Sequence, residues 1–142
     1  MLGYCYDNGI GTGVNKQKAF ELYQGAAKLG NSAAQYNLGL MYENGSSIEK
    51  YYVKAFELFK KSAKGGNANG MIMLGYYYNN GIGTNINKHK AIELYQKAAN
   101  LGNSAAQHNL GLMHVCIKME MVLKKIMLKL LNYLRNQLKE IM

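Results

Sequence analysis

The chain has 142 residues, of which 49% are apolar and 16 are glycine, with no proline or tryptophan. This length and composition favour a single helical domain whose loops are marked by glycine. The formal net charge is +9, but the lysines are scattered along the sequence instead of clustered. A solvated surface explains such a pattern better than an interface for nucleic acid or an acidic membrane, and we do not expect either as the main partner.

Export and membrane insertion are not indicated by this sequence. It contains no run of about 18 apolar residues, the length that a spanning helix needs. Its first residues do not form a basic and then apolar leader. The cysteines, Cys5 and Cys116, occupy non-equivalent positions, so no repeating disulfide is encoded. We therefore expect a cytoplasmic protein.

The sequence repeats itself with a period of 36 residues. One leucine-glycine pair occurs four times, as Leu2-Gly3, Leu38-Gly39, Leu74-Gly75 and Leu110-Gly111. Units one and three are close copies, since 27 of the 36 positions from Leu2–Asn37 are identical in Leu74–Asn109. A fixed period of this size is typical of proteins built from stacked helix pairs. The sequence thus predicts an all-α solenoid of antiparallel helix pairs.

The first unit is truncated. Residues 1–8 correspond to the second half of a first helix, and nothing matches the opening that unit two has in Ser32–Asn37. A helix without its first turn leaves backbone N–H groups unpaired. This predicts that the chain is a fragment of a longer array.

A glycine-rich segment, residues 9–14, follows this first helix and recurs at residues 81–84. A phosphate-binding loop would need a strand before it, whereas helices flank this segment, so we interpret it as a turn with positive φ. Asn15 and Asn87 then occupy the N-cap position of the second helix. Unit two has Tyr51 there, a poor cap, which predicts a looser loop.

The second helix of each unit is expected at residues 16–29, 52–64 and 88–101. Small and large apolar residues alternate along one face of each helix, at the spacing i, i+3, i+4, i+7 and i+8. The first of these faces consists of Ala19, Leu22, Tyr23, Ala26 and Ala27. Such alternation suits close helix packing, because alanine lets two backbones approach and the aromatic ring fills the groove.

Unit two carries the clearest family pattern. Ala34, Leu38-Gly39, Tyr42 and Gly45 are followed by Lys54-Ala55, Ser62-Ala63 and Gly66. The pattern resembles the Sel-like repeat family, relatives of tetratricopeptide repeats, and the resemblance implies a right-handed α-solenoid. We expect this array to span residues 1–113, with a truncated first repeat at 1–31, repeats at 32–67 and 68–103, and the start of a fourth at 104–113.

Residues 114–142 depart from the pattern and form a divergent basic tail with a charge of +4. Its apolar residues recur at helical spacing, which predicts a long helix packed against the last repeat.

The codons of this tail can also be read from their third base, so that each new residue spans the junction of two codons. Whatever codons are used, the Met119/Glu120 and Met121/Val122 junctions then encode glycine, and Asn132/Tyr133 encodes leucine. The other junctions permit NGNGIEKDYVKAFELFKKSAKGNN, against NGSSIEKYYVKAFELFKKSAKGGN in residues 44–67. The tail is either genuine or an out-of-frame fourth repeat.

Residues able to carry out chemistry do not converge in this sequence. His89 and His108 replace Gln17 and Tyr36 of the first two units, so neither position requires imidazole. Metal ligands would have to converge at short spacing, and no nucleophile, base and orienting group occur together. We expect no enzymatic activity, no catalytic residue, no cofactor, no metal and no small-molecule substrate.

The surface formed by the first helices is the expected binding site. Stacked helix pairs present these helices along a concave groove, and methionine, tyrosine and asparagine suit adaptable recognition. Residues of the first helices that the core does not require are expected to line it. They are Asn37, Met41, Asn44, Met73, Tyr77, Asn80, Asn109 and Met113.

The function that this resemblance implies is that of a non-enzymatic scaffold or adaptor that binds a partner protein or peptide in the groove. Two alternatives remain open. The basic amphipathic tail could bind an acidic membrane or nucleic acid, with strong salt dependence. Cysteine-rich bacterial relatives also suggest a β-lactamase-like enzyme, and the lack of paired cysteines in each repeat argues against it.

Overall fold

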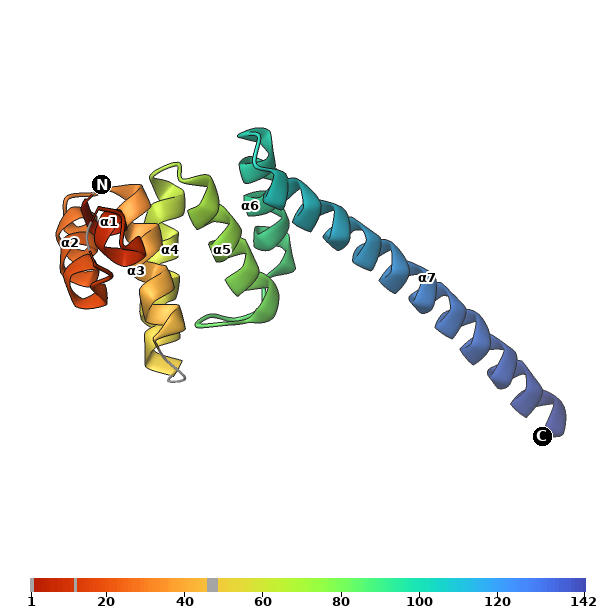
Figure 1. The fold of residues 1–142 in the computed structure, drawn as a ribbon. Coiled ribbons are helices and arrows are strands. Elements are labelled where there is room, and N and C mark those ends of the chain that lie inside the picture. Colours follow the sequence, from red (N-terminus) through yellow and green to blue (C-terminus); the bar gives the residue numbers. More distant parts are fainter. Residues whose placement is uncertain (1, 12, 46–48) are drawn as a thin grey trace.

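The described part of the chain is entirely helical in its regular structure, and each helix packs against the next (Figure 1). The computed structural model describes residues 2–11, 13–45 and 49–142. The first helices of the units are α1 (Leu2–Asn8), α3 (Ser32–Asn44), α5 (Ala68–Asn80) and the start of α7 (Ser104–Ile141). The second helices are α2 (Lys16–Lys28), α4 (Glu49–Lys64) and α6 (Lys88–Asn100). The predicted all-α solenoid of helix pairs is confirmed.

Asparagine side chains determine where most of these helices begin. Asn15 and Asn87 accept a hydrogen bond from the backbone N–H of Lys18 and Lys90, at 2.9 and 3.0 Å, so the two predicted N-caps are confirmed. The first helices have caps of the same kind that the sequence analysis missed. These are Asn31, Asn67 and Asn103.

Helix α4 differs from its equivalents. It begins at Glu49, before the expected start at residue 52, so Tyr51 lies inside the helix and is not its cap. No glycine or asparagine interrupts the sequence between Glu49 and Lys64, and helix propagation therefore extends further toward the N-terminus. The expected looseness of the preceding loop concerns residues 46–48, which lie outside the described residues.

The core is divided into three clusters that follow the repeat. Each cluster joins a second helix to the first helix of the next unit through a small residue and a buried ring. The alternation of alanine and aromatic residues predicted from the sequence is thus what fills the space between helices. The buried members are Ala19, Tyr23, Ala34 and Leu38; then Ala55, Phe56, Phe59, Leu74 and Tyr77; then Ala91, Tyr95 and Met113.

Glycine in the first helices permits a close approach within each helix pair. A Cβ atom built on Gly39 would lie 2.6 Å from Cε1 of Phe59, and one on Gly75 would lie 2.8 Å from Cε1 of Tyr95. No real Cβ atom tolerates such a contact, so only glycine fits. The repeated leucine-glycine pair therefore supplies a buried side chain and, next to it, the space for an aromatic ring.

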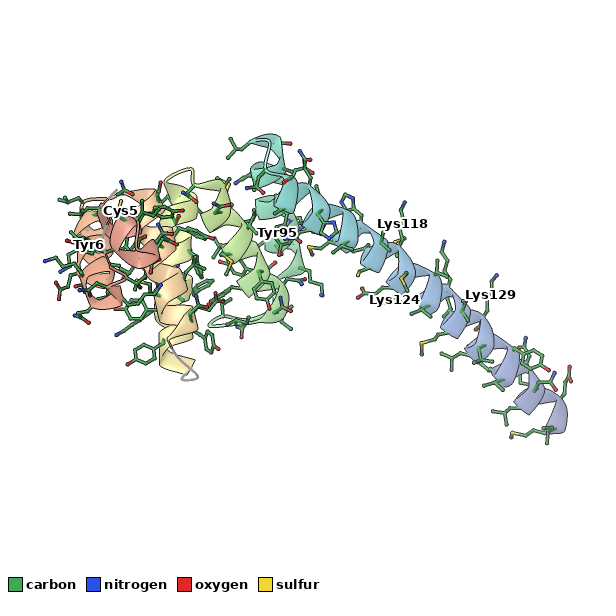
Figure 2. All side chains as sticks on the ribbon, in the orientation of Figure 1. Cys5, Tyr6, Tyr95, Lys118, Lys124 and Lys129 are labelled. Carbon is green, nitrogen blue, oxygen red and sulfur yellow. The ribbon has the colours of Figure 1, made fainter. Side chains whose placement is uncertain are left out.

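The basic tail is helical, but it does not pack against the last repeat. It continues the first helix of unit four without a break, so that α7 has 38 residues where α3 and α5 have 13. In Figure 1 this helix leaves the array as a straight rod. Lys118, Lys124 and Lys129 are exposed along it (Figure 2).

Candidate binding groove

Two pockets lie between neighbouring first helices. The N-terminal pocket, of about 390 Å³, is formed by α1, the start of α2 and α3. Its residues are Asp7, Lys16, Asn37, Leu40, Met41, Asn44 and Gly45. The C-terminal pocket, of about 270 Å³, is formed by α5, α6 and α7. Its residues are Tyr76, Asn79, Asn80, Lys88, Tyr95, Asn109, Leu112, Met113, Cys116, Ile117 and Glu120.

The two pockets are repeats of one another. Adding 72, twice the repeat period, to each residue number of the N-terminal pocket gives a residue that lines the C-terminal pocket. Asn37 corresponds to Asn109 in this way, and Met41 to Met113. The same positions therefore face a hollow in alternate units, which is what a binding surface repeated along a solenoid requires.

The junction between the two pockets is filled. At the equivalent positions, 36 residues from each pocket, Tyr52 replaces the lysine, Met73 replaces the asparagine and Tyr77 replaces the methionine. All three side chains belong to the central core cluster, and Tyr77 is fully buried. The Tyr77 hydroxyl donates a hydrogen bond to Oε1 of Glu43 at 3.0 Å. We call Glu43, Tyr52, Met73 and Tyr77 the tyrosine partition.

The eight groove residues predicted from the sequence therefore fall into two groups. Six of them line a pocket, three in each: Asn37, Met41 and Asn44, then Asn80, Asn109 and Met113. The expected exposure of Tyr77 is wrong, because its side chain is fully buried, whereas Met73 is partly buried against the same cluster and lines neither pocket. Met113 is also mostly buried, and only its edge reaches the C-terminal pocket.

Polar residues from the other side of each pocket were not predicted. Lys16 forms an ion pair with Asp7 in the N-terminal pocket. In the C-terminal pocket Asn79 replaces the aspartate, and Lys88 donates a hydrogen bond to its Oδ1 at 3.3 Å. The signal that could have found them was the 72-residue recurrence of the lysine, which unit two lacks. The ammonium group of Lys88 faces a neutral amide where that of Lys16 faces a carboxylate.

Buried tyrosines beside the groove have raised pKa values. Burial, and then the charge of Glu43 and the hydrogen bond to it, raise the pKa of the Tyr77 hydroxyl far above its usual range. Burial and, to a smaller extent, Tyr76 raise the pKa of Tyr95 to about 12. Both side chains are therefore neutral below pH 10 in the folded and the unfolded chain.

Alkaline pH is expected to destabilise the array. Between pH 10 and 12 the unfolded chain releases protons that folded Tyr95 still holds, so its contribution of about 2 kcal/mol is present below pH 10 and lost as pH rises to 12. Urea denaturation at pH 8 to 11.5 measures this loss. Tyr95→Phe should make the decline less steep, and an unchanged decline would contradict this assignment.

Among the described residues, no cluster of three or more histidine, cysteine, aspartate or glutamate side chains could hold a metal ion. His89 is exposed on α6, and its Nε2 lies 3.3 Å from Oε1 of Glu93. Within the same residues, none of the helices combines the length and apolar character that a bilayer crossing demands.

The comparisons with known proteins identify the family. The Sel1 repeat model matches residues 1–31, 32–67, 68–103 and 104–116, which is most of the chain. The chain therefore belongs to the Sel1 repeat family, and the resemblance to Sel-like repeats is confirmed. Proteins of this family are in general helical scaffolds for protein–protein interaction and are typically not enzymes. A search of curated proteins gave no match.

Solved structures of Sel1 repeat proteins share this fold. A Sel1 repeat protein from Oxalobacter formigenes is 39% identical, with a TM-score of 0.70 over 78% of this chain and 46% of its own. The protective antigen c5321 of uropathogenic Escherichia coli is 36% identical, with a TM-score of 0.74 over 80% of this chain and 25% of its own. Cysteine-rich protein B of Helicobacter pylori is 32% identical, with a TM-score of 0.62 over 68% of this chain and 72% of its own. The chain thus spans less than half the length of the first two.

Proposed function

We propose that this chain is a non-enzymatic interaction scaffold that binds an extended segment of a partner protein across the two pockets. The observation that carries the proposal is the 72-residue correspondence between the N-terminal and C-terminal pockets. The core does not need asparagine at position 37 or 109, since position 73 holds methionine and packs well. The asparagine retained at both junctions that contain a pocket is therefore free to contact a ligand.

The chemistry of the pockets suits a peptide. The amide of asparagine offers both a donor and an acceptor, which match the N–H and C=O groups of an extended backbone. Methionine adapts its shape to different apolar side chains. The tyrosine partition separates the pockets, so a bound segment would place one side chain in each pocket and cross the partition between them. Lys88, which has no carboxylate within 4 Å among the described residues, favours an acidic group in the C-terminal pocket.

A peptide-display experiment tests this function. We expect a random displayed peptide library to yield binders to the chain, and the double variant Asn37→Ala with Asn44→Ala to weaken them at least tenfold. The matched control is Gln96→Ala with Asn100→Ala, which removes two exposed amides of α6 that are hydrogen-bonded to each other. Circular dichroism verifies that both variants fold. Failure to select any peptide, or equal losses in the two variants, would refute the proposal.

A further inference from the structure

Gly111 lacks the partner that its three equivalents have. A Cβ atom on Gly3, Gly39 or Gly75 would meet an aromatic ring of the following second helix, at 3.0, 2.6 and 2.8 Å. A Cβ atom on Gly111 would meet nothing within 4 Å. Because each of the three equivalent glycines faces an aromatic ring, the repeat predicts that a ring belongs opposite Gly111 as well.

The surface around Gly111 is also uncovered. Leu38 and Leu74 are 4% and 5% exposed, but the equivalent Leu110 is only half-buried. Helix α3 ends at Asn44 and α5 at Asn80, where the chain turns back to form the next helix. Helix α7 instead continues straight on (Figure 1), and its apolar side chains beyond Ile117 are all exposed. In water, a helix that exposes so much apolar surface and makes no tertiary contact is poorly stabilised.

We propose that this surface is the docking site for the second helix of a fourth repeat, and that this helix is encoded out of frame by the codons of the tail. The occupant is thus a specific segment, DYVKAFELFKKSAKG or a close variant of it. This inference is independent of the proposed function.

The register of the shifted reading supports this occupant. We remove eight nucleotides: the codons of Met113 and His114 and the first two bases of the Val115 codon. The codons that follow are then read in the shifted frame, and unit four aligns with unit two without a gap. The shifted reading then places methionine or a related residue directly after Leu112, as Met41 follows Leu40.

Three codon junctions fix the shifted residue whatever codons are used, and all three fit; others, such as Lys125/Ile126, restrict it to two residues. The Met119/Glu120 and Met121/Val122 junctions give glycine at the positions of Gly45 and Ser47, and the second of these is glycine in units one and three as well. The Lys125/Ile126 junction gives asparagine or aspartate, the N-cap residues, where those units have Asn15 and Asn87. Asn132/Tyr133 gives leucine at the position of Leu58.

The shifted reading also permits the missing ring. The Tyr133/Leu134 junction permits phenylalanine at the position equivalent to Phe59, which is the residue that faces Gly39. In the same reading the C-terminal pocket gains asparagine or aspartate and then glycine in place of Cys116 and Ile117. Those residues match Asn44 and Gly45 of the N-terminal pocket, so the two pockets would become closer copies.

The first test is the nucleotide sequence of the transcript from the codon of Leu112 to that of Met142. We expect codons that read through in the shifted frame without a stop and give phenylalanine opposite Gly111. A stop codon in the shifted frame would overturn the proposal, and so would a codon for a non-aromatic residue opposite Gly111.

The second test compares Gly111→Ala in two proteins, the present chain and a chain from which the eight nucleotides have been removed. In the present chain the substitution should raise Tm by about 3 °C, because nothing opposes the new methyl group. In the restored chain it should lower Tm, as Gly75→Ala should in either protein. The same sign in both chains, or a restored chain no more stable than the present one, would overturn the proposal.

Discussion

Replacing Phe59 with alanine is expected to destabilise the array by about 3–5 kcal/mol. The ring is fully buried in the central cluster. It packs edge-on against Tyr77 with centroids 5.2 Å apart, and it also contacts Tyr36 at 6.2 Å. It lies over Gly39 as well, where no side chain can move in to fill the cavity. The midpoint of urea denaturation, with the slope held constant, measures this loss.

A control on the same helix separates this effect from loss of helix propensity. Val53 lies on α4 as Phe59 does, but it is 45% exposed. Val53→Ala should change the free energy of unfolding by no more than about 0.5 kcal/mol. Because stacked repeats share their stability through neighbouring interfaces, Phe59→Ala should weaken units two and three together. Two separate unfolding transitions with an unchanged second midpoint would contradict this coupling.

The architecture was predictable because each structural role is seen several times in the sequence. A leucine-glycine pair that recurs every 36 residues marks a helix and its closest contact. In the structure the ring of Phe59 packs against Gly39, and that of Tyr95 packs against Gly75. The beginning of α4 was not predictable from the same logic. Unit two has no asparagine at the cap position, and its second helix begins earlier, at Glu49.

The groove was predicted only in part, because equivalent positions were assumed to have equivalent surroundings. Position 77 corresponds to Met41 and Met113, but a tyrosine there fills the hollow that methionine leaves open. The sequence did contain a signal for this difference. Tyr52 and Met73 depart from the other units together with Tyr77, and three coupled changes toward apolar residues at one junction indicate that the junction is packed.

Gly70→Ala should be strongly destabilising alone, and Ser62→Ala should relieve the part of that loss that comes from the serine hydroxyl. A Cβ atom on Gly70 would lie 2.7 Å from Cβ of Ser62 and 3.0 Å from the backbone nitrogen of Ala63, and it would also clash with the Ser62 hydroxyl. That hydroxyl cannot turn away easily, because it is buried and donates a hydrogen bond to the Ser32 carbonyl oxygen at 2.7 Å. Overpacking of this kind costs about 1–3 kcal/mol.

The repeats themselves indicate the rescue. The positions equivalent to Ser62 and Gly70 are both alanine in the other units, as Ala26 with Ala34 and Ala98 with Ala106. Ser62 and Gly70 thus replace two alanines, so that α4 gains a hydroxyl oxygen and α5 loses a Cβ atom. Ser62→Ala alone should cost about 1 kcal/mol, because the Ser32 carbonyl loses its donor.

The double variant restores a pair that two other junctions of this chain already use, but alanine at position 62 keeps a Cβ atom 2.7 Å from the new methyl group, so part of the loss should remain. A double-mutant cycle by urea denaturation measures the coupling, which we expect to exceed about 1 kcal/mol in favour of the double variant. Additive losses would mean that the Cβ atom of residue 62 and the backbone nitrogen of Ala63, and not the serine hydroxyl, exclude a methyl group at position 70. In that case the α4–α5 junction would be closer than its equivalents, and the compensation between units would have to lie in the backbone.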